Sequence, residues 1–183
     1  MESRNDRPHG IDREDMVQVD QPRQKVYEAL KDLDIEFQVY DHPPISHRGE
    51  AFHFPQAIEG GRCRNLFLRN SGGKNHYLVI LELDVPLDLG ILSQRLSEKR
   101  LGFASEERLM RVLGVLPGSV SPFNFLNGKG KDVFIIVDQA LLRHEKLVFH
   151  PNENTASLVL SVKDFKKYLQ TLGNRIEFLD LSR

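Results

Sequence analysis

In one stretch of the sequence, LGVLPGSVSPFNFLN, the residue types are suited to presenting backbone N–H groups to a ligand. Gly114, Pro117, Gly118 and Ser119 follow a helical pattern there, and glycine lets a ligand approach backbone N–H groups closely. Such N–H groups bind an anionic or carbonyl oxygen. The same residue types are also typical of a helix C-cap followed by a turn. The residues alone leave both interpretations open.

A second candidate lies in RCRNLFL, where Arg64 and Asn65 begin a strand whose following residues are apolar. Side chains alternate between the two faces of a strand, so we expect these two to point in opposite directions. One of them can then face a pocket, and arginine offers a cation that keeps its proton. The alternative is an exposed strand end whose charge discourages pairing with another chain.

Two further segments place polar side chains beside apolar strands. In FHPNENTASLVLS, His150 follows one strand, and Asn154 and Thr155 precede another. A histidine in such a loop can line a pocket or only satisfy backbone groups. In DHPPISHRGEA, two prolines stiffen the backbone, and His42 and His47 can face either way. By itself this last segment indicates only a loop.

Hydrophobic periodicity predicts the elements that position these residues. We expect a helix at about residues 21–33 and a strand from Phe37 to Val39. We also expect a β-hairpin from 66–68 and 77–83 around the turn-forming residues 70–73, then two helices between 88 and 114 around a break at 102–105. Ser105 opens the second of these helices. The last third reads as the strands VFIIVD, LVFH, ASLVLS and RIEFLDL, with the helix VKDFKKYLQTLG ending at Gly173.

Composition limits the possible classes of protein. The 183 residues, 40% of them hydrophobic, suit one compact domain. The order of the predicted strands and helices indicates an α+β fold, and we expect its central sheet to be mixed, mostly antiparallel and flanked by helices. A net charge of -1 means that any contact with RNA must be local. The single cysteine, Cys63, excludes an internal disulfide and a cysteine zinc site. Residues 1–20 are predicted to be a charged peripheral tail before a domain at 21–183, and without an apolar membrane span the expected location is the cytoplasm.

The order of these segments resembles the YbaK/prolyl-tRNA-editing superfamily, and within it the free-standing prolyl-tRNA deacylases of the PrdX or ProX type. The matching stretches are YDHPP, RNLFLRNSGGKNHYLVIL, LGFASEERLMRVLGVLPGSVSPFNFLN, VFIIVDQALL and FHPNENTASLVLSVKDFKKYLQTLG. They cover about residues 21–181 in the order and at the spacing of the family. Several long matches together are more specific than any one motif.

The resemblance implies a hydrolase that acts in trans, without a metal or cofactor. It would cleave the ester that joins a wrong amino acid, most often alanine, to tRNA(Pro). The 114–119 loop would hold the aminoacyl ester, and His150 would shape the amino-acid pocket. Asn65 would contact the terminal adenosine of the substrate or its polar groups, and Asn154 and Thr155 match the polar loop of the family. Prolyl-tRNA synthetase is a further candidate partner.

Two residues depart from the pattern of the family. Many relatives carry lysine where this chain has Arg64, and threonine where it has His47. At position 64 the positive charge is kept, but a planar guanidinium binds phosphate or ribose with a different geometry. At position 47 the larger polar ring of histidine would contact the substrate and shrink or re-tune the amino-acid pocket. Three alternatives stay open: a non-catalytic module that binds tRNA or synthetase, editing of a different aminoacyl-tRNA, and a redox role for Cys63, which lacks a resolving cysteine.

Overall fold

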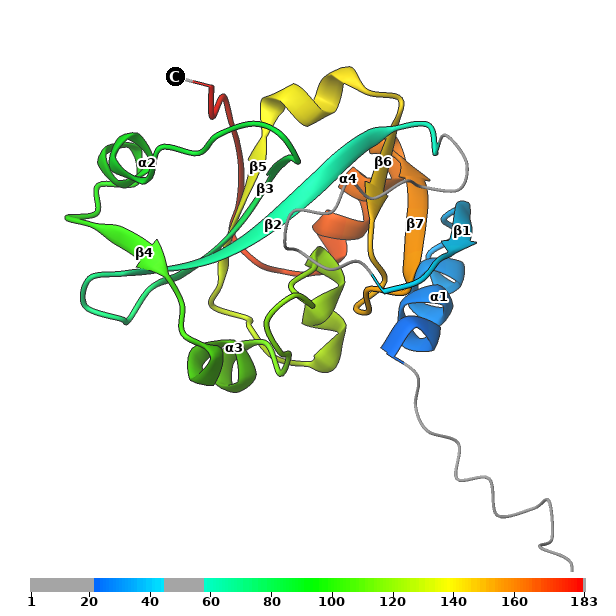
Figure 1. Cartoon of the computed structure of the whole chain (residues 1–183), viewed down its shortest axis with the longest axis horizontal. Helices are drawn as coiled ribbons and strands as arrows, with labels where there is room; N and C mark the ends of the chain where they lie inside the picture. Colours follow the sequence, from blue (N-terminus) through cyan, green and yellow to red (C-terminus); the bar gives the residue numbers. More distant parts are fainter. Residues whose placement is uncertain (1–21, 45–57, 183) are drawn as a thin grey trace, which may run out of the picture.

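The computed structural model describes residues 22–44 and 58–182, and in these ranges eight strands form one sheet (Figure 1). The strands are β1 (Phe37–Asp41), β2 (Gly61–Asn70), β3 (His76–Glu82), β4 (Leu101–Phe103), β5 (Phe134–Asp138), β6 (Lys146–Phe149), β7 (Ala156–Ser161) and β8 (Ile176–Leu179). The helices are α1 (Pro22–Asp32), α2 (Leu89–Arg95), α3 (Glu106–Val112) and α4 (Val162–Thr171), with the 3₁₀ helices η1 (Pro122–Asn127) and η2 (Gln139–Arg143). The predicted tail at 1–20 and His47 lie outside the described residues.

The sheet is mixed. Its strands follow the order β1-β7-β6-β2-β3-β5-β8, and β4 pairs with β2 beside this path. Neighbours run antiparallel in β1–β7, β6–β7, β2–β3 and β2–β4, and parallel in β2–β6, β3–β5 and β5–β8. The predicted α+β fold, with a mixed and mostly antiparallel central sheet flanked by helices, is therefore confirmed.

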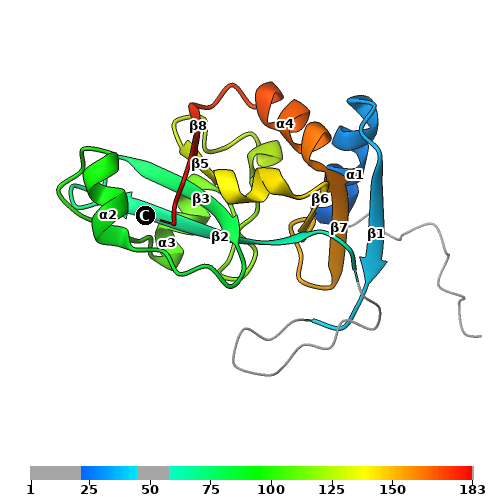
Figure 2. The same ribbon diagram turned by 90° about the horizontal axis from the view of Figure 1, so that it is seen from above.

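Two apolar clusters cover opposite faces of the central strands, because alternate side chains of a strand point to opposite sides. Phe67 and Ile80 belong to the larger cluster, which also takes side chains from α1, α3, η1 and α4. Leu68 and Val79 belong to the smaller cluster, which α2 completes. Figure 2 shows α1 and α2 at opposite ends of the molecule.

Most predicted elements are present, but the strand β4 and the two 3₁₀ helices, η1 and η2, were missed. The first helix, the β2–β3 hairpin and the order of elements after residue 133 agree with the sequence pattern. Ser105 caps α3 as expected, its hydroxyl accepting the N–H of Arg108 at 3.4 Å. The break between α2 and α3 is not a simple loop, because β4 lies in it and pairs with β2. In the described ranges, no helix has both the length and the apolar character needed to cross a membrane.

Candidate functional site

The candidate site lies where strand pairing along one edge of β2 is interrupted. Near the start of β2, Arg62 pairs with Val148 of β6, and near its end Leu68 pairs with Phe103 of β4. Residues 63–67 lie between these two partners. β6 runs parallel to β2, so extending its register by two residues beyond Val148 places His150 opposite residue 64, at the start of this interval. The chain after β4 continues into α3 and the glycine loop. The β6–β7 turn and the segment that leads through α3 to the glycine loop therefore both leave the sheet beside the interruption (Figure 1).

The glycine loop consists of two successive turns. Gly114, with φ of 74°, ends α3, and its N–H donates to the carbonyls of Leu109 and Met110, each at 3.1 Å. In the second turn the N–H of Ser119 donates to the carbonyl of Leu116 at 3.1 Å.

Pro117 and Gly118 occupy the centre of that second turn, and Gly118 has φ of 88°. Proline followed by a residue of positive φ is the arrangement of a type II turn. The N–H of Gly114 is occupied by its hydrogen bonds to the carbonyls of α3. The amide of Gly118, by contrast, forms no hydrogen bond with any described residue.

A buried network holds this loop in place. The Asn124 side chain is fully buried: its Oδ1 accepts the N–H of Ser121 at 2.7 Å, and its Nδ2 donates to the carbonyl of Ser119 at 3.1 Å and to Oδ1 of Asn152 at 2.8 Å. Asn152, with φ of 63°, donates in turn to the carbonyl of Phe123 at 3.2 Å. These bonds join the glycine loop to the β6–β7 turn.

His150 is held at the same junction through its backbone. Its carbonyl accepts the hydroxyl of Ser121 at 3.1 Å and the N–H of Asn152 at 3.0 Å. The side chain is half-buried. The structure thus brings His150 and the 117–119 turn together through a shared set of hydrogen bonds.

Sequence reasoning missed Asn124 and Asn152, although a local signal existed for the first. In SPFNFLN, Ser121 is an N-cap, Pro122 is the first helical residue, and Asn124 completes a capping box with its side chain. For Asn152 the only local sign is that asparagine tolerates positive φ better than most residues. Asn152 contacts Asn124, which lies 28 residues away in the sequence, so the pattern of neighbouring residues could not reveal this contact.

Asn65 and Arg64 point to opposite faces of β2, as the alternation of the strand predicted. Asn65 pairs with Ile80 of the larger core cluster, the face that carries α3 and η1. Its Oδ1 is buried and has no hydrogen-bond partner among residues 22–44 and 58–182. Arg64 pairs with Leu81 of the smaller cluster, and its guanidinium donates to the carbonyl of Val85 at 2.6 Å. Arg64 is therefore not brought to the face of the glycine loop.

The residues after His150 also close the turn that carries it. The hydroxyl of Thr155 donates to Glu153 at 2.7 Å, and the carbonyl of Thr155 accepts the N–H of His42 at 2.9 Å. Glu153 in turn lies 3.5 Å from Arg23 of α1. Thr155 therefore has a structural role, while contacts of Asn154 and Thr155 with a substrate remain predictions.

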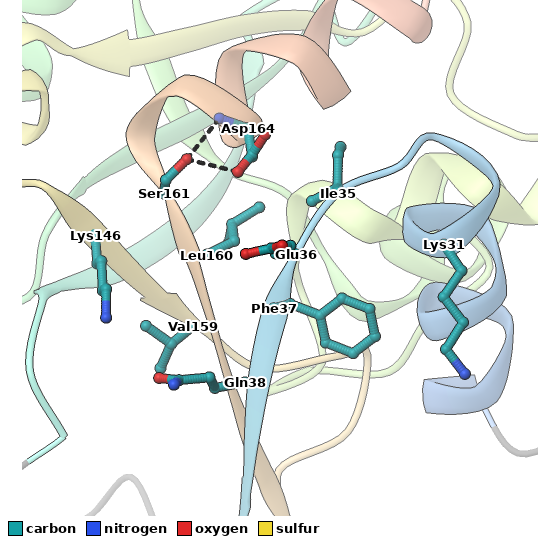
Figure 3. A pocket seen from close by; sticks show the side chains of 10 residues that line it. All are labelled: Lys31, Ile35, Glu36, Phe37, Gln38, Lys146, Val159, Leu160, Ser161 and Asp164. Atoms are coloured by element: carbon teal, nitrogen blue, oxygen red, sulfur yellow. Dashed lines mark hydrogen bonds between the residues drawn. The ribbon is translucent and has the colours of Figure 1, made fainter.

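A separate cavity and the single cysteine lie in the described part of the chain but supply no reactive group to this site. A cavity of about 680 Å³ beside β1 and β7 includes Ser161 and Asp164, which are joined by the N-capping bonds of α4 (Figure 3). Burial raises the pKa of the Cys63 thiol, so the thiolate that redox chemistry needs is disfavoured. Within the described ranges, no group of three His, Cys, Asp or Glu residues is placed to hold a metal ion.

Comparison with known proteins defines the class of this chain. The family model of the aminoacyl-tRNA editing domain matches residues 44–168. The chain therefore belongs to the aminoacyl-tRNA editing domain family. The class predicted from the sequence is confirmed, and with it the general activity of an aminoacyl-tRNA deacylase.

Within this family, the chain is similar to several individual proteins. The chain is 33% identical over 159 residues to the prolyl-tRNA editing protein ProX of Acetoanaerobium sticklandii, covering 87% of this chain and 97% of that protein. It is 31% identical over 156 residues to the prolyl-tRNA synthetase associated domain-containing protein 1 of Mus musculus, covering 83% and 92%. A crystal structure described as a candidate trans-editing enzyme for prolyl-tRNA synthetase shares the fold, with a TM-score of 0.63 at 21% identity over 87% of this chain and 96% of that one.

Proposed function

We propose that the protein acts in trans to hydrolyse the ester bond between a non-cognate amino acid, alanine in the first instance, and tRNA(Pro). One observation carries the proposal: the Gly118 turn, with an amide that has no partner among the described residues, is fixed beside His150 by the Asn124–Asn152 network. The similarity to ProX supports tRNA(Pro) as the substrate. We expect the activity in the cytoplasm, where tRNA is charged.

The need for such an activity follows from the size of the substrates. A synthetase pocket built for proline cannot strongly reject the smaller alanine, since each missing methylene group changes binding by only about 1–3 kcal/mol. A second site that hydrolyses the wrong product restores accuracy. A free-standing protein can supply that site.

The chemistry requires positioning more than a nucleophile. The vicinal ribose hydroxyl already activates the aminoacyl ester, so an oriented water and a polarised carbonyl are sufficient for attack. In this proposal the amide of Gly118 donates to the oxygen that becomes negative as water adds, and Ser119 and Pro117 hold that amide in its turn. Gly114 contributes by ending α3 at the correct place. Donors of this kind stabilise the developing charge without reorganising.

The remaining candidate residues have supporting roles. The buried Oδ1 of Asn65, which has no partner in the described part of the chain, is suited to accept a hydrogen bond from the substrate, because burying such an oxygen without a donor costs about 1–3 kcal/mol. His150 borders the amino-acid pocket and is not an obligatory base, because the substrate hydroxyl and water can carry the proton. Arg64 contributes through its charge or through the Val85 loop that it holds.

The experiment is a deacylation panel. Purified protein is incubated with alanyl, cysteinyl and prolyl esters of tRNA(Pro), and binding of uncharged tRNA(Pro) is measured in parallel. The proposal expects loss of the alanyl ester well above the rate in buffer and survival of the prolyl ester. Loss of none of the three beyond the buffer rate would refute the enzyme, and retained tRNA binding would then identify a non-catalytic module. Loss of the cysteinyl ester alone would assign a different substrate.

A further inference from the structure

A second cavity, of about 410 Å³, lies between the β2–β3 hairpin, the end of α3 and the loop after η1. We call it the basic cleft. Its lining residues are Lys74, His76, Arg111, Val112, Lys129, Gly130, Lys131, Asp132 and Val133. Four of these side chains carry a positive charge and one a negative charge, whereas the whole chain has a net charge of -1. The cleft is therefore a local concentration of positive charge on a nearly neutral protein.

The cations of the cleft are not neutralised within the described part of the chain. No described carboxylate lies within 4.0 Å of the ammonium groups of Lys74, Lys129 or Lys131. Arg111 reaches Glu107 at 4.0 Å, and both side chains are largely exposed, so this pair is weak. The three lysines and Arg111 are free to meet an anion.

Hydrogen bonds hold the backbone of the segment that carries Lys129 and Lys131. Gly130 has φ of 74°, and a Cβ there would lie 3.0 Å from the ring of Phe125, so glycine is required. The side-chain Nδ2 of Asn174 donates to the carbonyls of Gly130 at 2.9 Å, Lys131 at 3.1 Å and Val133 at 2.9 Å. The segment is therefore preorganised, which reduces the entropy lost when a ligand binds.

The cleft adjoins the candidate site. Lys129 lines the cleft and also a cavity of about 430 Å³ whose walls include Gly114, Ser119 and Asn152. The same lysine is thus common to the basic cleft and to the neighbourhood of the glycine loop. A chain of phosphates that leaves the loop can continue across Lys129 into the cleft.

We propose that the basic cleft binds the phosphodiester backbone of the acceptor arm of the tRNA whose aminoacyl end is held at the Gly118 turn. The inference rests on the proposed function for the direction of the RNA. Its chemistry is independent of that function, because phosphates attract any firmly placed group of cations. The cleft supplies affinity and orientation and takes no part in bond cleavage.

The test compares two double variants of equal charge. In Lys74→Glu/Lys131→Glu two lysines of the cleft that do not line the cavity beside the glycine loop become acidic, so the net charge of the lining side chains changes from +3 to -1. In the control, Lys31→Glu/Lys163→Glu, two exposed lysines of α1 and α4 are changed outside the cleft. Binding of uncharged tRNA(Pro) is measured at about 50 and about 200 mM salt, and single-turnover deacylation at saturating protein. Inorganic phosphate is added as a separate competitor.

We expect the cleft variant to bind tRNA at least about tenfold more weakly at the lower salt concentration. The slope of its log affinity against log salt concentration should become shallower by an amount that corresponds to about two phosphate contacts. Its rate at saturating protein should stay within about twofold of the wild type, and the control should bind normally. Equal weakening in both variants would overturn the proposal, as would normal tRNA binding by the cleft variant. Loss of phosphate competition with tRNA binding unchanged would assign the cleft to a free anion. Because uncharged tRNA is the binding probe, an absence of deacylation would count against the proposed function and leave this test intact.

Discussion

Replacement of Asn124 by alanine should damage both the stability and the activity of the protein. The side chain is fully buried and makes three hydrogen bonds, to Ser121, Ser119 and Asn152. Each bond contributes about 1 kcal/mol, and buried partners left without a bond cost at least as much. We therefore expect Asn124→Ala to lower the free energy of unfolding by about 3 kcal/mol and to reduce the deacylation rate at saturating protein.

The matched control is Asn127→Ala, in the same 3₁₀ helix. Asn127 is exposed and makes one hydrogen bond, to the carbonyl of Leu113 at 3.3 Å, so its loss should cost about 1 kcal/mol or less. Urea denaturation gives both free energies, and deacylation is measured well below the unfolding transition. If Asn124→Ala were as stable and as active as Asn127→Ala, the network would not position the glycine loop.

Two further predictions concern the loop and the hairpin. Gly118→Ala should lose rate at saturating protein, because alanine disfavours φ of 88° and loss of an oxyanion donor costs about 3 kcal/mol. Arg64→Ala should mainly lose tRNA affinity at low salt. Single-turnover rates and tRNA-binding curves test both variants, and a normal rate in Gly118→Ala beside a lost rate and normal binding in Arg64→Ala would contradict this assignment. The pKa of Glu98 is lowered chiefly by the hydroxyl of Tyr77 and also by Asn75 and Asn70. Its contribution to stability should be complete above its ordinary pKa and disappear as pH falls through the lowered value. Denaturation midpoints measured on acidification should therefore fall less steeply in Glu98→Gln, and identical slopes would contradict this.

The basic cleft makes a fourth prediction through His76. Burial, followed by the charges of Arg108 and Arg111, lowers the pKa of this histidine. The guanidinium of Arg108 lies 3.5 Å from its Nε2, and Lys74, Lys129, Lys131 and Asp132 line the same cavity. Bound phosphates would offset the positive charges, so RNA should raise the pKa of His76. An NMR titration of its ring protons with and without an RNA acceptor hairpin measures this, and an unchanged or lowered pKa would count against binding in the cleft.

The fold was largely predictable because its signals are local. The apolar runs of β2 and β3, the glycines at the hairpin turn and the Ser105 cap each depend on neighbouring residues. β4 was missed because its three residues are a strand only through pairing with β2. A strand so short has no periodicity of its own to detect.

The site was predictable in part for the same reason. Alternation correctly separated Arg64 from Asn65, and Gly114 and Gly118 do adopt positive φ. The sequence could not show that Arg64 bonds to the carbonyl of Val85, nor that Asn124 and Asn152 join two distant loops. These contacts depend on how the sheet brings remote segments together. His47 lies outside the described residues, so its role stays a prediction.

The most direct test of the account is a competition within one reaction. Ala-tRNA(Pro) and Pro-tRNA(Pro), carrying different amino-acid labels, are mixed with far less protein than substrate, and release of each amino acid is followed with time. The account predicts many turnovers of the alanyl ester and release of proline at the rate in buffer. Release of both amino acids at equal rates, or of neither above the buffer rate, would contradict it.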